Sequence, residues 1–332
     1  MKRESLQKIL GSLTKRIVAK YNPKVVAITG SVGKTSTKNA IALLLEKNFT
    51  VWGKSGNLNT EFGVPLAFMG KDKGGGDSFW RWGKIILFGI HLLVKKRNNY
   101  PDIVIAEMGA DRPGDISYLT SLIKPDISII TMIGEIPVHL ENYGSIQEVT
   151  EEKARIIEGT KPGGFIILNS DDPKVKEMGK NSNSILVYYG FDEGADVRIS
   201  DFTIETRGPF KDKTLYGSSF KLTYKGRSER IHLPYCIGKP SAYSVAAAYA
   251  CGMAMGIDLS RFADIFRDLK PEEGRMNFIE ANNYSVIDDT YNASPASVES
   301  ALETIKEIPA RRKIVILGDM KELGDRSSGA HR

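Results

Sequence analysis

The sequence is poor in the residues that build disulfide and zinc frameworks. Its 332 residues include two cysteines, Cys236 and Cys251, and four histidines. The cysteines have no metal-ligand spacing and form no disulfide framework, which excludes a small disulfide-rich secreted fold and suits a reducing cytoplasm. The segment 1–20 carries Lys and Arg throughout and no sustained apolar stretch, so it does not resemble a secretory signal. We therefore expect a cytoplasmic protein.

The sequence also lacks an apolar run long enough to cross a membrane. The best candidate, 85–94, is well short of the roughly 20 residues that a spanning helix needs. Aromatic and basic residues flank it within the segment 79–97, as in helices that lie on a membrane surface. We expect a helix that lies outside the catalytic site and packs against the protein, and membrane-surface contact is the less favoured alternative.

Nucleic-acid binding finds no support, because no tract interleaves basic residues with aromatics as single-strand binders do. The formal net charge of +6 is mildly basic and suits an anionic small-molecule substrate. Apolar residues make up 41% and charged residues 26%, which is ordinary for a soluble globular protein, and the length allows about two domains. We expect small-molecule partners, no nucleic acid and a monomer.

Short apolar runs alternate with helical patterns along most of the chain. This alternation predicts an α/β fold with a P-loop-type, mostly parallel sheet flanked by helices. The runs expected to form its strands are 25–29, 103–106, 127–131, 165–168 and 185–189. Three later segments alternate apolar with polar residues and predict a small antiparallel appendage to the sheet; they are 197–200, 219–224 and 230–233.

The chain divides into three predicted parts. A helical extension, 1–22, precedes a central domain, 23–273, and a linker near 269–274 leads to the start of a Rossmann-like α/β domain, 274–332. In this last part we expect strands at 285–287 and 313–317 with a helix at 296–306. Two or three strands are few for an independent sheet, so the chain is expected to be truncated at its C-terminus.

A glycine-rich segment follows the first predicted strand and opens a predicted helix over 34–47. Glycines let the backbone approach phosphates, and a helix N-terminus adds partial positive charge. Lys34 would pair with the β- and γ-phosphates of ATP, and the Thr35 hydroxyl would bind Mg²⁺. Ile28 stands where the usual motif has its first glycine, so this is a shortened phosphate loop. We expect nucleotide contacts from Gly30, Ser31, Val32, Gly33, Lys34, Thr35 and Ser36.

Glu107 ends the buried strand predicted at 103–106. It would therefore lie at the carboxyl edge of the sheet, where open α/β sheets bind ligands. A carboxylate there can neutralise a magnesium ion on the phosphates. A surface or ion-paired glutamate is the alternative.

Several segments in sequence order resemble the Mur ligase family, from about Val25 to the last residue. Two of them, 288–295 and 317–324, are similar to the MurF type in particular. The other matching segments are 29–38, 56–66, 107–116, 139–145 with Lys153, and 168–172. The resemblance implies that the family's N-terminal UDP-binding domain and most of its C-terminal domain are absent.

The resemblance implies a metal centre that spacing alone does not show. Taken alone, His139 would be a structural or exposed histidine, and Lys153 a solvated lysine on a charged helix. The resemblance implies that Lys153 reacts with CO₂ to form a carbamate, an anionic oxygen ligand that a hard cation prefers. Two Mg²⁺ ions are then expected, with ligands from Thr35, Glu107, His139 and carbamylated Lys153, and catalytic roles for Lys34, Lys153 and His139.

Further contacts follow from the same resemblance. Asn57 and Asn59 would orient the carboxylate substrate, and three residues of the last domain, Arg275, Asp289 and Asn292, would reach ATP when the domains close. Ser244 stands where the family has an asparagine that contacts adenine, so adenine recognition departs from the pattern.

The activity implied is ATP-dependent amide-bond formation in the synthesis of peptidoglycan precursors. A substrate carboxylate attacks the γ-phosphate to give an acyl phosphate, and an amine then displaces phosphate. In the MurF type the acid is a UDP-N-acetylmuramoyl-tripeptide and the amine is D-alanyl-D-alanine. The alternatives are a folylpolyglutamate or cyanophycin synthetase type of ligase, and a non-catalytic nucleotide-binding relative.

Overall fold

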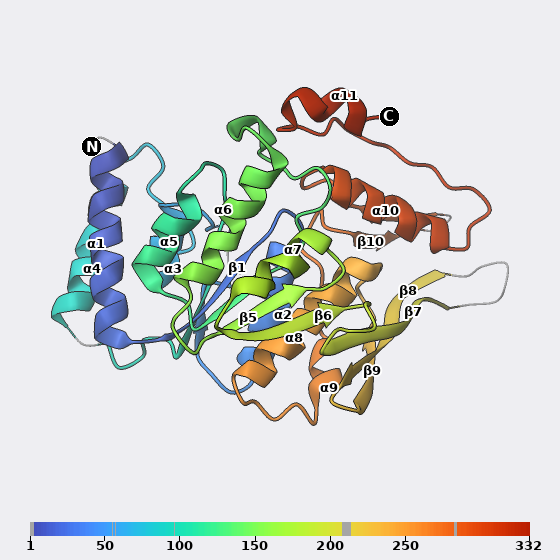
Figure 1. Ribbon diagram of the computed structural model, residues 1–332, viewed down its shortest axis with the longest axis horizontal. Coiled ribbons are helices and arrows are strands. Elements are labelled where there is room, and N and C mark those ends of the chain that lie inside the picture. The colour runs from blue at the N-terminus through green and yellow to red at the C-terminus, as the bar shows by residue number, and fades with distance from the viewer. Residues whose placement is uncertain (1–2, 55, 57, 96, 208–213, 282–283) are drawn as a thin grey trace.

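One mixed sheet organises the part of the chain that the computed structural model describes, residues 3–54, 56, 58–95, 97–207, 214–281 and 284–332 (Figure 1). Its strand order is β2-β3-β1-β4-β5-β6-β7-β8-β9. The strands are β1 (Lys24–Thr29), β2 (Val51–Trp52), β3 (Ile103–Glu107), β4 (Ile127–Ile130), β5 (Phe165–Asn169), β6 (Ile185–Gly190), β7 (Val197–Arg207), β8 (Thr214–Tyr224) and β9 (Arg227–Leu233).

Strands β2 through β7 pair in parallel, and β8 and β9 continue the same sheet in antiparallel fashion. The expected α/β fold with a small antiparallel appendage is therefore confirmed. The central strands are apolar at almost every position because helices cover both of their faces; β3 and β4 are buried along their whole length.

Helices form a layer on each face of the sheet (Figure 1). One face packs against α2, α8 and α9, and the other against α3, α5, α6 and α7. The helices are α1 (Arg3–Tyr21), α2 (Lys34–Leu45), α3 (Gly63–Phe68), α4 (Phe79–Val94), α5 (Asp115–Ile123), α6 (Ile146–Gly159), α7 (Pro173–Met178), α8 (Lys239–Ala254) and α9 (Phe262–Phe266), with 3₁₀ turns at η1 (Leu140–Asn142) and η2 (Gly179–Asn181).

Helices α1 and α4 form a further layer outside α3 and α5. The expected N-terminal helix and the expected helix at 79–97 are both present, and the second ends at Val94. Leu10 and Ile17 of α1 are fully buried against Ile85 and Leu92 of α4. Lys20 Nζ donates to the Leu92 carbonyl at 2.9 Å, which ties the ends of the two helices together. None of the described helices combines the length and the apolar character needed to span a bilayer.

The segment after the linker folds into a hairpin and helices. Its elements are β10 (Asn277–Glu280), β11 (Ser285–Asp288), α10 (Pro295–Glu307), η3 (Gly324–Arg326) and α11 (Ser327–Ala330). The strand expected at 285–287 and the helix expected at 296–306 are confirmed. The strand expected at 313–317 is wrong. A strand needs a neighbour that exchanges backbone hydrogen bonds, and within the described ranges none pairs with this segment, where Ile316 is 93% exposed.

We predict that Leu10→Ala lowers the free energy of unfolding by about 2–5 kcal/mol, since the truncation leaves a cavity between α1 and α4. Ile9→Ala on the same helix is the matched control, because Ile9 is 37% exposed; its effect should be about 0.5 kcal/mol. Urea unfolding followed by circular dichroism measures both. Equal losses would mean that α1 is not part of the folded core.

Candidate active site

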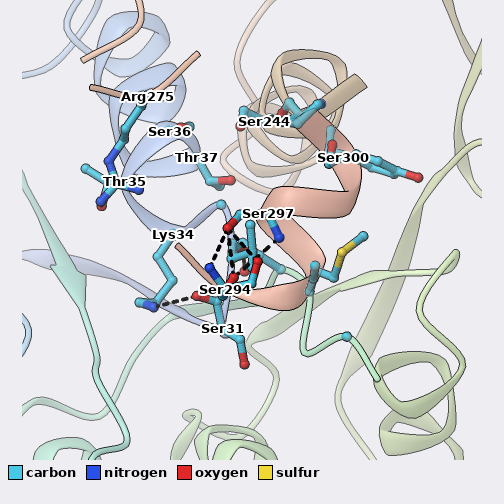
Figure 2. Close-up of a pocket in the computed structure, with 18 of the residues that line it drawn as sticks. Ser31, Lys34, Thr35, Ser36, Thr37, Ser244, Arg275, Ser294, Ser297 and Ser300 are labelled. Carbon is cyan, nitrogen blue, oxygen red and sulfur yellow. Dashed lines mark hydrogen bonds between the residues drawn. The ribbon is translucent and has the colours of Figure 1, made fainter. Parts of the chain in front are cut away.

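A cleft of about 810 Å³ opens at the carboxyl ends of the parallel strands. Its walls come from the start of α2, from the loops after β4 and β5, from the start of α8 and from the segment after the linker. Figure 2 shows Lys34, Thr35 and Ser36 on one side and Ser294 and Ser297 of α10 beyond them. Open α/β sheets bind ligands at this edge, so the cleft is the candidate active site.

The predicted phosphate loop joins β1 to α2, as expected. The Ser31 backbone N–H donates to the Met132 carbonyl at 2.7 Å, which fastens the loop to the segment after β4. Gly30 has a φ of 144°, and a Cβ there would lie 2.0 Å from Thr131 Oγ1, so no side chain fits. Gly33, with a φ of 86°, turns the chain into α2.

The backbone N–H groups that lack an acceptor at this site lie chiefly at the start of α2. The N–H of Val32, like that of Ser31, already donates to Met132 O. The first N–H groups of a helix have no intrahelical acceptor, so those at the start of α2 face the cleft. The buried Ser31 hydroxyl has no hydrogen-bond partner among the described residues. Phosphate oxygens would satisfy these groups, so the loop fits an ATP phosphate chain.

Lys34 folds back over the loop. Its Nζ donates to Gly30 O at 2.8 Å and lies 3.4 Å from Ser31 O. Burial lowers the pKa of Lys34, Glu107 opposes that change, and the Arg275 cation lowers the pKa further. An anionic phosphate near Nζ would favour the charged form and offset this burial.

Glu107 lies at the end of β3, at the floor of the cleft. The Thr35 hydroxyl donates to its Oε2 at 3.2 Å, and Lys38 Nζ lies 3.5 Å from the same oxygen. Glu107 and Lys38 are almost completely buried, so the carboxylate is a paired group as well as a ligand candidate. Sequence reasoning did not select Lys38, although it lies one helical turn from Lys34. The hydroxyl and carboxylate oxygens are donors that suit Mg²⁺.

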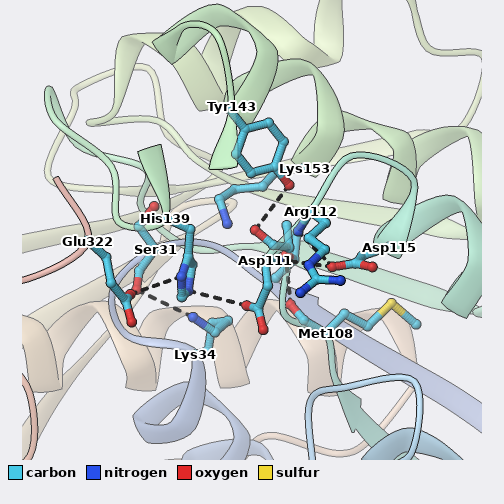
Figure 3. Close-up of polar contacts among 12 residues, drawn as sticks. Ser31, Lys34, Met108, Asp111, Arg112, Asp115, His139, Tyr143, Lys153 and Glu322 are labelled. Atoms are coloured by element: carbon cyan, nitrogen blue, oxygen red, sulfur yellow. Dashed lines mark hydrogen bonds and ion pairs between the residues drawn. The ribbon is translucent and has the colours of Figure 1, made fainter. Parts of the chain in front are cut away.

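His139 lies between two carboxylates (Figure 3). Its Nε2 is 3.3 Å from Asp111 Oδ1, and its Nδ1 is 2.9 Å from Glu322 Oε2. Asp111 and Glu322 were not selected as site residues, although both lie in segments that resemble the family. Within the described ranges, no three His, Cys, Asp or Glu side chains gather closely enough to hold a metal ion by themselves. A metal here would also need the Thr35 hydroxyl, phosphate oxygens or a modified lysine.

Lys153 is buried in α6, with 1% exposure, and is not a solvated lysine. Its Nζ donates to Gly30 O at 3.4 Å, the carbonyl that Lys34 also contacts. Burial, with a smaller effect of the Lys34 cation, lowers the pKa of Lys153 to about 7, while Asp111 opposes the change. The side chain is therefore present in part as a neutral amine near pH 7.

The neighbouring Glu152 holds α6 against α5. Its two carboxylate oxygens accept the backbone N–H groups of Gly114 and Ile116 at 2.9 and 2.8 Å. These donors lie at the start of α5, where a negative charge is favourable. The Tyr143 hydroxyl, labelled in Figure 3, donates to Ala110 O at 3.1 Å. These contacts hold the chain on both sides of Asp111.

Arg275, Asp289 and Asn292, which were predicted to reach ATP from beyond the linker, are among the residues that line the cleft. Arg275 Nη2 donates to Thr35 Oγ1 at 3.3 Å, and its guanidinium stacks 4.1 Å from the Tyr291 ring centroid. Asp289 accepts the Met276 N–H at 3.0 Å, and burial raises the pKa of its carboxyl. The last segment therefore reaches the phosphate loop directly.

Of the two asparagines predicted to orient the carboxylate substrate, one lies among the described residues. Asn59 lines the cleft, and its backbone carbonyl accepts the Gly109 N–H at 2.7 Å. Asn57 lies outside the described residues. Ser244 also lines the cleft, but its hydroxyl donates to Pro240 O at 3.0 Å within α8. No side-chain amide is therefore available at that position.

Asp172 is a supporting residue that sequence reasoning did not select. Its carboxylate accepts the N–H groups of Ile133, Gly134 and Lys174 at 2.7, 2.9 and 3.0 Å. It caps α7 and at the same time holds the segment that binds the phosphate loop. An aspartate directly before a proline at the first helical position was the available signal.

The family description "Mur ligase middle domain" matches residues 87–252, and "Mur ligase, glutamate ligase domain" matches residues 274–332. The chain is 30% identical over 346 residues to the UDP-N-acetylmuramoyl-tripeptide–D-alanyl-D-alanine ligase of Rickettsia prowazekii, covering 99% of this chain and 65% of that protein.

Two solved structures are similar over nearly the whole chain. MurF from Acinetobacter baumannii is 26% identical, with a TM-score of 0.78, and the matched region covers 97% of this chain and 62% of the MurF chain. MurF from Thermotoga maritima in complex with ADP is 26% identical, with a TM-score of 0.78, and the matched region covers 98% of this chain and 66% of the MurF chain.

The chain thus spans a little under two thirds of the length of these relatives. The middle-domain match alone covers half of the 332 residues, and the sheet, the phosphate loop and the linked last segment agree with it. On this evidence the protein belongs to the Mur ligase family.

Proposed function

We propose that the chain forms an amide bond at the expense of ATP, joining D-alanyl-D-alanine to a UDP-N-acetylmuramoyl-tripeptide with release of ADP and phosphate. One observation carries the proposal: Lys34 and Lys153 come from different helices and donate to the same carbonyl, Gly30 O, at the mouth of the phosphate loop. The relative from Rickettsia prowazekii bears the name of this ligase, and the MurF structure from Thermotoga maritima holds ADP, which supports the assignment.

In this mechanism the start of α2 and Lys34 bind the phosphates. The substrate carboxylate oxygen attacks the γ-phosphorus, and the bond to the ADP oxygen breaks, giving an acyl phosphate. The amine nitrogen then attacks the acyl carbon, phosphate leaves, and the nitrogen loses a proton. Thr35 and Glu107 would hold Mg²⁺, which supplies neutralising charge on the phosphate oxygens. Lys34 stabilises charge that develops on the transferred group.

The last segment completes the site. Contacts of Arg275 with Thr35 and of Glu322 with His139 hold it over the phosphate loop, which supports a closed arrangement. Asp289 and Asn292 would contact ATP from this side, and Asn59 with Asn57 would orient the carboxylate substrate.

A ligase with another acid and amine, of the folylpolyglutamate or cyanophycin synthetase type, is the first alternative. A non-catalytic nucleotide-binding protein is the second. Lys34, Thr35 and Glu107 line one cleft, and Lys153 Nζ donates to Gly30 O of the phosphate loop at 3.4 Å. This argues against the second alternative, because a scaffold needs no buried lysine of lowered pKa beside its phosphate loop.

The proposal predicts phosphate release that depends on both the muramoyl tripeptide and D-alanyl-D-alanine. Lys34→Ala should lower the rate by about 10²–10³-fold, because an electrostatic contact to the transferred group is lost. Lys47→Ala, at an exposed position just after α2, is the matched control and should leave the rate unchanged. Release with glutamate and a folate, but not with these substrates, would favour the first alternative. Full activity of Lys34→Ala would exclude the assigned phosphate loop.

We further infer that Lys153 acts as a carbamate. Its amine nitrogen would attack the carbon of CO₂ and lose one proton, giving an anionic oxygen donor. The reaction needs a neutral amine, which the low pKa of Lys153 supplies. Nearby Lys34 would stabilise the anion. The carbamate and His139, with Glu107, would hold or orient a second Mg²⁺.

The carbamate hypothesis predicts opposite behaviour of two variants. Lys153→Ala should lose activity and regain part of it with added acetate or another short carboxylate, which fills the vacated ligand position. Lys153→Arg should stay inactive with or without acetate, because a guanidinium keeps its charge and cannot form the carbamate. Phosphate release measures both. Near-normal turnover by Lys153→Arg would rule the carbamate out.

The lowered pKa of Lys153 also predicts a pH dependence of stability. Below about pH 7 the lysine is protonated in both states, and the burial cost is fully present. Between about pH 7 and the ordinary lysine pKa of 10.5, the unfolded chain binds a proton that the folded chain does not, so stability rises with pH. Urea unfolding in CO₂-free buffer should show this rise for the native chain, and a smaller rise for Lys153→Met. Identical slopes would contradict the burial of a free amine.

A further inference from the structure

The outward face of α4 is apolar and exposed to solvent. One side of this helix, with Ile85, Gly89 and Leu92, is buried against the protein. On the opposite side the exposed fractions are 80% for Trp80, 66% for Leu87, 43% for Ile90 and 82% for Val94. Their spacings of seven, three and four residues place them along one stripe. We call these four residues the outer face of α4.

The charged side chains of α4 and of the segment that follows it have one sign. Between Ser78 and Pro101 the sequence carries five basic residues and no acidic one. Arg81, Lys84 and Lys95 are exposed, and by helical spacing Lys84 and Lys95 flank the outer face. A further cation lies at the edge of the helix, since Lys71 Nζ is 4.0 Å from the Phe88 ring centroid.

The helix is held rigidly in this exposed position. The Ser78 hydroxyl accepts the Arg81 N–H as an N-cap, and Trp82 Nε1 donates to Gly76 O at 2.8 Å. At the other end, Lys20 of α1 donates to the carbonyl of Leu92. The outer face therefore needs no ordering before it binds, which lowers the cost of association.

These features fit an anionic membrane surface. A helix with aliphatic residues and tryptophan on one face and lysine and arginine beside them lies in the headgroup region of a bilayer, where tryptophan is favoured. Anionic headgroups complement the row of cations. Figure 1 shows α4 at the end of the molecule away from α10, and no residue of α4 lines the cleft. Binding by this face would leave the cleft open.

We propose that α4 attaches the protein peripherally to anionic membranes by inserting its outer face among the lipid headgroups. This contact is independent of the proposed ligase activity. The packing of α4 against the protein that the sequence predicted is present on one side of the helix. The proposal adds a membrane contact on the other side, which the sequence alone did not favour because it could not show that only one side is covered.

Flotation with vesicles tests the proposal. The native chain should float with mixed phosphatidylcholine–phosphatidylglycerol vesicles, less so at high salt, and not with phosphatidylcholine alone. Leu87→Glu and Val94→Glu should each reduce the bound fraction by about tenfold or more, because a carboxylate opposes both apolar insertion and anionic lipid. Both positions are well exposed, so folding should be preserved, and thermal melting checks this. Lys84→Gln with Lys95→Gln should weaken binding to the mixed vesicles.

Ile316→Glu is the matched control, since it places the same charge on an exposed apolar side chain outside α4 and should bind like the native chain. The native protein should also show a blue shift of tryptophan fluorescence on mixed vesicles that is smaller in Trp80→Phe. Absence of flotation, or equal flotation of the native chain and both glutamate variants, would overturn the proposal. So would a dimer without lipid affinity that Leu87→Glu dissociates, because the outer face would then bind a second copy.

Discussion

The geometry of the candidate active site depends on a pair of backbone hydrogen bonds, from the N–H groups of Ser31 and Val32 to the Met132 carbonyl. They fix the phosphate loop to the segment after β4, and that segment is held in turn by the Asp172 carboxylate. The same pair of hydrogen bonds places Gly30 O where both Lys34 and Lys153 reach it. Loss of this pair would leave two buried lysines without a fixed acceptor.

Electrostatics give the cleft its chemistry. Lys34, Lys153 and Arg275 bring three basic groups towards the phosphate loop, and Lys34 and Lys153 have lowered pKa values because burial disfavours their charge. Glu107 is the buried carboxylate among them, and its partners are a hydroxyl and Lys38. Phosphate oxygens close to Lys34 and Lys153 would favour the charged forms of both lysines. An anionic ligand would thus offset the cost of burying these cations.

Much of the fold was predictable, because apolar runs that end in glycine or a carboxylate mark buried parallel strands, as at Thr29 and Glu107. The phosphate loop followed from its place between strand and helix. The burial of Lys153 could not be predicted, because the residue lies in a run of charged residues. Which side of α6 faces the sheet becomes visible only in the folded structure. Glu322 reaches His139 through a tertiary contact that local sequence does not encode. The prediction of a strand at 313–317 was wrong because a segment of high strand propensity forms a strand only beside another strand that pairs with it.

The strand order has a consequence for synthesis on the ribosome. β1 pairs with β3 and β4, so its hydrogen-bonding edges stay empty until much later residues emerge. From Thr29 to Ile103 the separation is 103 − 29 = 74 residues, which at 5–20 residues per second takes about 4–15 s. Over that interval the apolar β1 and the glycine loop exist without their sheet. A nascent chain of this topology needs protection from premature association.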